Sequence, residues 1–362
     1  MRRLYVISWS VALIAVACFW YVRPSTTFRV SERAPVPKAW LHNATPSLAP
    51  AKNVRPPDQT YLTYPEWFLV FGPAEYAESM RTRTATTFPL TTHIHQAWES
   101  YAAVSDQLVG NYPPNDEYNT TIRVINISST FEFGIKAAYE EVIGRITDVG
   151  SGTIATEEDR FAARFAQEYI DFIYFVPWYE FDFIKQTKVL WMDVPWFGAH
   201  PLRKLERRFF LTSEMLTKAA YGWANKIAAH AAYGEELLIT YVVLERAPAG
   251  KMAGVTIKET YPDGSVLAEW PRYGPFTPLA IEAARQGIAF REIAGNRTAI
   301  LISAVGPADW QPTGKAVSLF SQSIPTKPGF HRWAIATPVA ELHTTLKRMA
   351  DAGLTVEHVF DF

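Results

Sequence analysis

The chain has 362 residues, 48% of them hydrophobic and 14% aromatic, and its 35 basic and 36 acidic residues give a formal net charge of -1. This length and apolar content allow one large or two ordinary globular domains and argue against a mostly disordered chain. The balanced charge argues against a nucleic-acid partner, and the single cysteine, Cys18, leaves no disulfide framework and no CxxC motif.

The first predicted element is a membrane-spanning helix near the N-terminus. Residues 5–22 contain no charged side chain, and Trp20 and Tyr21 lie at their end, shortly before Arg23 and Pro24. A transmembrane helix needs about 20 apolar residues to cross roughly 30 Å of hydrocarbon, so this segment is just long enough. Its aromatic end is typical of a membrane interface. We therefore expect residues 1–24 to form an uncleaved anchor whose partner is the lipid bilayer.

Two alternatives to this anchor stay open. A cleaved signal peptide has an apolar core of about 7 to 15 residues, and the residues up to Cys18 resemble a degenerate lipoprotein cleavage site. Basic residues flank residues 5–22 on both sides, so their count does not decide the orientation. Because long domains cross membranes largely regardless of their charge, we expect a single-pass protein of the bacterial inner membrane with its body in the periplasm.

The next two regions differ in composition. Prolines recur within residues 25–60, which predicts a semi-extended linker with a rise of up to about 3.1 Å per residue. Residues 61–235 predict a mainly helical domain. In it, a capping-type start at Thr156 opens a helix that Pro177 ends, and a long amphipathic pattern runs through residues 202–227.

Residues 236–362 predict a small α+β domain with a largely antiparallel sheet. Residues 261–264, Tyr-Pro-Asp-Gly, are a turn signal between two strand patterns. A second hairpin is expected through Gly295 and Asn296, and the chain ends in a β-α-β pattern. The predicted fold class is thus α+β, with an N-terminal transmembrane helix, a linker, a helical region and this C-terminal domain.

Acidic and aromatic side chains supply the candidate ligand and catalytic groups. Paired carboxylates beside aromatic rings are typical of glycosidases and sugar-binding clefts, although an aromatic core with acids at its rim gives the same pattern. The candidate catalytic residues are Glu66, Glu180 and Asp182, and the candidate ligand-binding residues are Trp67, Trp178 and Tyr179.

A basic turn opens the long amphipathic pattern. It consists of Arg203, Lys204, Arg207 and Arg208. A turn of this kind is typical of a solvated helix face, and it is also suited to an anionic membrane surface.

No metal or cofactor is expected. His93 and His95 are the only close histidine pair, and on a helix they point about 200° apart, which does not suit a shared ion. Residues 150–155 match the loose G-x-G-x-x-A form of the dinucleotide fingerprint, but a helical pattern precedes them where a strand is needed. We therefore interpret them as a loop between helices.

Three blocks of the sequence resemble bacterial membrane-anchored proteins of no assigned function. They are residues 60–77, in which Thr-Tyr-Leu-Thr-Tyr-Pro-Glu-Trp leads to Tyr-Ala, residues 177–181, Pro-Trp-Tyr-Glu-Phe, and the ending at 356–362, Val-Glu-His-Val-Phe-Asp-Phe. The resemblance implies a bacterial source and a single anchor, and it assigns no activity.

Two functional hypotheses follow from these patterns. The first is a non-enzymatic envelope protein that binds or scaffolds another envelope component, a protein or a glycan. The second is an envelope hydrolase or transferase that acts on a glycan or peptidoglycan-type substrate with paired carboxylates. The second hypothesis requires two of the candidate acids to converge in one pocket.

Overall fold

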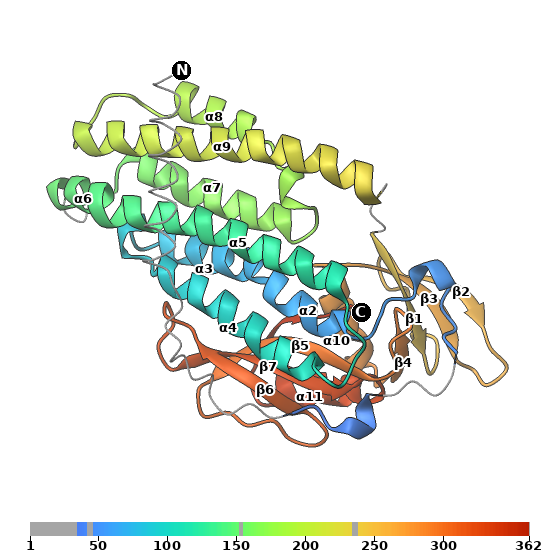
Figure 1. Cartoon of the computed structure of the whole chain (residues 1–362). Helices are drawn as coiled ribbons and strands as arrows, with labels where there is room; N and C mark the ends of the chain where they lie inside the picture. Colours follow the sequence, from blue (N-terminus) through green and yellow to red (C-terminus); the bar gives the residue numbers. More distant parts are fainter. Residues whose placement is uncertain (1–34, 42–45, 152–154, 234–237, 362) are drawn as a thin grey trace. The chain divides into compact units, whose positions relative to one another are not determined.

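The computed structural model describes residues 35–41, 46–151, 155–233 and 238–361 (Figure 1). The predicted anchor at residues 5–22, which includes Cys18, and residues 152–154 of the predicted loop at 150–155 lie outside them. Within the described residues, no helix combines the length and the apolar character that crossing a membrane requires. The predicted α+β class is confirmed.

The chain divides into two compact units that alternate along the sequence. The helical unit contains Phe68–His95 and Ile127–Glu236, and the sheet unit contains Ser25–Trp67, Gln96–Asn126 and Leu237–Phe362. The sequence suggested consecutive segments with boundaries after residues 60 and 235.

The unit boundaries after His95 and after Asn126 fall inside two helices, α4 (Leu90–Leu108) and α5 (Asp116–Tyr139). Each of these helices therefore belongs partly to both units.

The helical unit is built from helices of different lengths. They are α3 (Phe68–Met80), the second half of α5, α6 (Arg145–Ser151), α7 (Glu157–Ile173), α8 (Phe183–Met192) and α9 (Pro201–Tyr233). A π-helical segment, Glu140–Gly144, joins α5 to α6. In Figure 1, the axes of α5, α7 and α9 are roughly aligned within this unit, and α5 runs in the opposite direction to α9.

The start of α7 confirms the predicted cap. The Thr156 hydroxyl accepts a hydrogen bond from the Asp159 amide at 3.2 Å, and the Asp159 carboxylate accepts one from the Thr156 amide at 3.0 Å. This reciprocal pair satisfies two amides that a helix start leaves without partners. The helix then buries Phe161 and Phe165, and it ends before Pro177.

The sheet unit contains two antiparallel sheets of four strands, with the same connectivity. The first half has β1 (Ile239–Leu244), β2 (Thr256–Thr260), β3 (Val266–Pro271), α10 (Phe276–Arg285) and β4 (Phe290–Ile293), in the sheet order β2-β3-β1-β4. The second half has β5 (Ala299–Pro307), β6 (Val317–Ser323), β7 (Phe330–Pro338), α11 (Leu342–Asp351) and β8 (Thr355–Val359), in the order β6-β7-β5-β8. The unit is therefore a structural repeat, which the sequence did not reveal.

One core joins the two halves of the repeat. Buried side chains of both sheets pack with those of α10 and α11, including Trp270, Phe276, Ile302 and Leu346. Alternate residues of each strand must face this core because side chains of a strand point to opposite sides in turn. The long apolar runs of β5 and β7 are nevertheless buried along most of their length.

One predicted hairpin is confirmed and the other is wrong. β2 pairs with β3 around residues 261–264, where the Gly264 amide donates to the Tyr261 carbonyl at 2.9 Å. β4 and β5, by contrast, belong to different sheets. The turn between them includes Ala294 and Gly295 with φ of 48° and 85°, and the Ala294 amide donates to the Tyr241 carbonyl on β1. The tight turn therefore sends the chain from one sheet to the next.

Part of the predicted linker packs on the sheet unit. The Leu48 and Ala49 amides donate to the Glu292 carboxylate, both at 3.1 Å, and the Arg55 amide donates to the Ala294 carbonyl at 2.8 Å. This stretch leads into α2 (Gln59–Glu66), whose Thr60 hydroxyl accepts from the Leu301 amide. Residues 46–58 are thus bound to the fold rather than extended as a spacer.

Candidate functional site

Four basic side chains at the start of α9 lie inside the helical unit. Arg203, Lys204, Arg207 and Arg208 are only 1%, 4%, 2% and 2% exposed. The prediction of a solvated or membrane-facing basic surface is wrong for them, because α9 turns these positions inward. A buried charge is costly unless it is paired and hydrogen-bonded, so the interior must supply carboxylates.

Glu158 in the first turn of α7 supplies one of these carboxylates. It is fully buried and accepts hydrogen bonds from Lys204 Nζ at 2.8 Å and from Arg208 Nη2 at 2.6 Å. Arg208 also donates to the Val194 carbonyl at 3.0 Å, and its guanidinium lies 4.1 Å from the centre of the Trp196 ring. One carboxylate therefore balances two cations.

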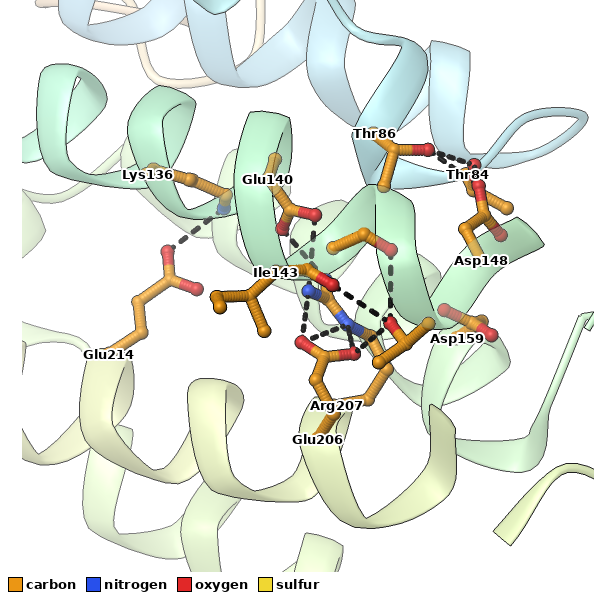
Figure 2. A network of polar contacts seen from close by, with 12 residues as sticks. Thr84, Thr86, Lys136, Glu140, Ile143, Asp148, Asp159, Glu206, Arg207 and Glu214 are labelled. Atoms are coloured by element: carbon orange, nitrogen blue, oxygen red, sulfur yellow. Dashed lines mark hydrogen bonds and ion pairs between the residues drawn. The ribbon is translucent and has the colours of Figure 1, made fainter. Parts of the chain in front are cut away.

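Arg203 and Arg207 bind a second set of carboxylates, and Figure 2 shows the contacts of Arg207. Arg203 donates to Asp159 at 2.9 Å. Arg207 binds both oxygens of Glu140, at 2.7 and 3.1 Å, and its Nε donates to Glu206 at 2.8 Å. Burial opposes the charge of Arg207, but hydrogen bonds to Glu206 and the charge of Glu140 outweigh burial and raise the pKa of Arg207.

The same polar layer continues along α5 and α9. Lys136 pairs with Glu214 at 3.0 Å, and Lys218 pairs with Glu132 at 2.8 Å. Burial favours the neutral form of Glu214, but Lys136 and Lys218 outweigh it and lower the pKa of this carboxyl. The Glu132 side chain is 43% exposed and is the surface partner of Lys218. We call the other paired side chains the buried charge network: Lys136, Glu140, Glu158, Asp159, Arg203, Lys204, Glu206, Arg207, Arg208, Glu214 and Lys218.

A pocket of about 550 Å³ lies beside one end of the buried charge network. Its polar lining includes Thr86, Glu140, Glu141, Arg145 and Asp148. Asp148 accepts hydrogen bonds from the Thr86 hydroxyl at 2.6 Å and, as Figure 2 shows, lies near Thr84, whose hydroxyl donates to it at 2.8 Å. The pocket could therefore hold a small polar ligand, with its carboxylates held in place by neighbouring donors.

The π-helical segment brings Glu140 close to Gly144 and makes glycine necessary there. A methyl group on Gly144 would overlap the Glu140 carboxylate and would lie 3.0 Å from Cγ2 of Thr86. We expect Gly144→Ala to lower the free energy of unfolding by about 1–3 kcal/mol, as overpacking does. Chemical denaturation measures this change.

Gly222 of α9 is the matched control, because a methyl group there meets Trp178 and Tyr179 only at 3.5 Å. Alanine favours a helix interior over glycine by up to about 1 kcal/mol, so Gly222→Ala should leave stability unchanged or raise it. Equal losses in the two variants would contradict the crowding at Gly144.

The three candidate catalytic acids have separate partners. Glu66 accepts a hydrogen bond from the Tyr118 hydroxyl at 2.8 Å in the sheet unit. In the helical unit, Glu180 pairs with Lys226 at 2.6 Å. Asp182 caps α8 by accepting from the Lys185 amide at 2.8 Å. These contacts give each acid a structural role.

The candidate ligand-binding aromatics fall into two places. Trp67 is only 5% exposed and stacks on His358, with 3.4 Å between the ring centroids, so it is a core residue of the sheet unit. Trp178 stacks on Tyr221 of α9 at 5.4 Å and contacts Tyr179 edge to face. Both Trp178 and Tyr179 are half-buried within the helical unit.

The histidine pair separates on α4. His93 Nε2 lies 3.1 Å from a Glu75 oxygen, and its ring stacks on Phe88. In the part of the chain that the structure describes, no group of three or more metal-ligating side chains is found around His93, His95 or elsewhere.

His358 gives the sheet unit a predictable response to acid. Burial first, and then the nearby charge of Arg272, holds the pKa of His358 well below 6.5. Below pH 6.5 the unfolded chain therefore binds a proton that the folded protein does not bind. The contribution of His358 to stability is complete above pH 6.5 and is lost as the pH falls toward its native pKa.

We expect His358→Phe to reduce this pH dependence. Between pH 7.5 and 5.5 the wild type should lose about 1 kcal/mol more stability than the variant, because one proton linked over one pH unit changes stability by about 1.4 kcal/mol. Urea unfolding at both pH values measures the difference. Burial also lowers the pKa of His331, but that residue titrates in both proteins, and parallel pH profiles would contradict the assignment.

The sequence did not reveal the acidic partners of the network. The sequence predicts only a helix start at Thr156 in this region, and it gives no role to Glu158, Glu140 or Glu214. One sequence signal indicates this pairing. It is the acid-rich start of α7 combined with the four cations at the start of α9. Comparison of the chain with family models, with curated proteins and with solved structures returns no match.

Proposed function

We propose that the protein is a membrane-anchored component of the bacterial cell envelope, with its body in the periplasm, that binds or scaffolds another envelope protein or a glycan. The observation that carries the proposal is the uncharged segment at residues 5–22, followed by a body large enough for two compact units. Such a segment is long enough to hold the chain in a bilayer.

The side chains of the helical unit favour a scaffold over a catalyst. The acids and cations of the buried charge network pair with one another, as in the contacts of Glu158 and Arg207. Paired buried networks make a structure rigid, and here Arg203 Nε, Arg208 Nη1 and Glu214 Oε2 are the described network atoms without a hydrogen-bond partner. Glu180 and Asp182 have partners of their own, which does not favour the hydrolase or transferase alternative.

Membrane extraction and a reporter fusion test the proposal. The full chain is expressed in a bacterial host, membranes are washed with alkaline carbonate, and periplasm-active or cytoplasm-active reporters are fused after Phe362. We expect the chain to resist extraction and the periplasmic reporter to be active. Leu13→Arg should release the chain, since a cation at the centre of a membrane helix costs about 2.5–3.5 kcal/mol.

Two results would overturn the proposal. One is full extraction of the wild type or activity of the cytoplasmic reporter alone. The other is turnover of an envelope glycan by the purified chain that Glu66→Gln, Glu180→Gln or Asp182→Asn abolishes.

A further inference from the structure

The outward side of α9 is apolar over most of its length. From Pro201 to Asn225, none of the exposed side chains is charged, and all seven charged residues of this described stretch are turned inward. The large exposed residues are Leu202, Leu205, Phe209, Leu216 and Trp223, which are 46–68% exposed. Their spacing of three, four or seven residues places them on one helix face.

Helix α5 and its continuation run antiparallel to α9 and also expose apolar side chains, here beside the exposed charges of Glu132, Glu141 and Arg145. Lys218 pairs with Glu132, Glu214 with Lys136, and the Phe210 ring stacks on Tyr139 with 4.2 Å between centroids. Residue numbers thus rise along one helix as they fall along the other. The exposed apolar residues of this second helix include Ile127, Phe131, Ile135, Val142 and Ile146.

We call these ten exposed residues of the two helices the apolar band. On α9 it is the reverse of an ordinary water-facing helix, in which apolar residues face the core and charges face solvent. Exposed apolar side chains gathered along neighbouring helices are typical of an interaction site. The pairing of buried charges beneath it is the pattern expected where the outer surroundings are apolar.

The opposite pattern on α7 shows that the apolar band is not a general property of this unit. The exposed residues of α7 include Arg160, Arg164, Glu168 and Asp171, while Phe161 and Phe165 are buried. Helix α7 therefore has a water-facing side, and the helical unit has one polar and one apolar exterior.

We propose that the apolar band lies against the acyl chains of the membrane to which residues 5–22 attach the protein. The inference rests on the proposed function for that attachment. Lipid suits the band better than a second protein, because aromatic and cationic residues that favour membrane interfaces lie near its ends. They are Trp196, Phe197 and Arg145 near the start of α9, and Trp223 and Lys226 near its other end.

A second argument for lipid is proximity. A chain that is already anchored presents the apolar band to the bilayer at high effective concentration, so a weak contact is sufficient. An anchor plus an apolar helix face is the type of double attachment that holds proteins stably at membranes.

Site-directed spin labelling of the full chain in lipid vesicles tests the proposal. Cys18 is changed to serine, and a nitroxide is attached at Phe209→Cys or Ile135→Cys in the band, or at Arg164→Cys on α7 as the matched control. All three positions are exposed or half-exposed surface sites, where substitutions usually change stability by less than about 0.5 kcal/mol. Collision rates with oxygen, which concentrates in lipid, and with a water-soluble nickel chelate are then compared.

We expect the ratio of oxygen to nickel collisions to be several-fold higher at both band positions than on α7. Nickel collisions at the band equal to those on α7 would overturn the proposal. The proposal would also be overturned if the band positions are shielded from both reagents and two Phe209→Cys chains form a disulfide crosslink. That result would assign the band to contact with a second copy.

Carbonate extraction is measured on the same samples. If the chain is extracted, the proposed function has failed; if it stays anchored with a water-exposed band, only this inference has failed.

Discussion

Replacement of Glu158 by alanine is expected to lower the free energy of unfolding by about 3–5 kcal/mol, because it leaves Lys204 and Arg208 buried without their carboxylate. Both cations are less than 5% exposed, so water cannot replace the lost partner without rearrangement of α9. Urea unfolding monitored by circular dichroism measures the loss.

The neighbouring Glu157 is the matched control for this prediction. It lies in the same turn of α7 but pairs with Arg160 at the surface, where both side chains are about half exposed. Surface ion pairs contribute about 0–1 kcal/mol, so Glu157→Ala should cost little. Similar losses for Glu157→Ala and Glu158→Ala would show that Glu158 acts as an ordinary helix-start acid and would contradict the buried charge network.

Replacement of Trp67 by alanine is expected to have a comparably large effect in the sheet unit. Trp67 stacks on His358 and meets Phe360 edge to face, and it is almost completely buried. Truncation of a buried tryptophan to alanine costs about 3–5 kcal/mol because it removes apolar contacts and leaves a cavity. Thermal or urea unfolding measures the change.

The graded control is Trp67→Phe, which keeps an aromatic ring against His358 and should lose clearly less stability than Trp67→Ala. If Trp67→Ala and the wild type unfold at the same midpoint concentration of denaturant, Trp67 is not part of the core. In that case the earlier interpretation of Trp67 as a ligand-binding residue would regain support.

Local chemistry explains which parts of the fold were predictable. The cap at Thr156 and the turn at residues 261–264 depend on hydrogen bonds between residues three or four apart, so their signals lie within a few positions of each other. The separation of β4 from β5 depends on pairing with β1 and β7, which lie elsewhere in the chain. A short apolar strand fits several partners equally well, and tertiary packing selects one.

The candidate site was less predictable for a related reason. Glu66, Glu180 and Asp182 were chosen because acids stand beside aromatic rings in the sequence, but their partners Tyr118, Lys226 and the Lys185 amide define their roles. A carboxylate next to a ring is compatible with catalysis, capping or ion pairing. Only its spatial neighbours distinguish these roles.

Helix α9 shows most clearly what the sequence by itself determined and what it left open. The spacing of Leu202, Leu205 and Phe209 established an amphipathic helix with its basic residues on another side. It did not establish which side faces the interior. The tertiary structure decided this by placing Glu158 of α7 and Glu140 of the π-helical segment opposite Arg207 and its neighbours. Because distant carboxylates compensate the buried cations, the charged side turned inward and the apolar side was left exposed.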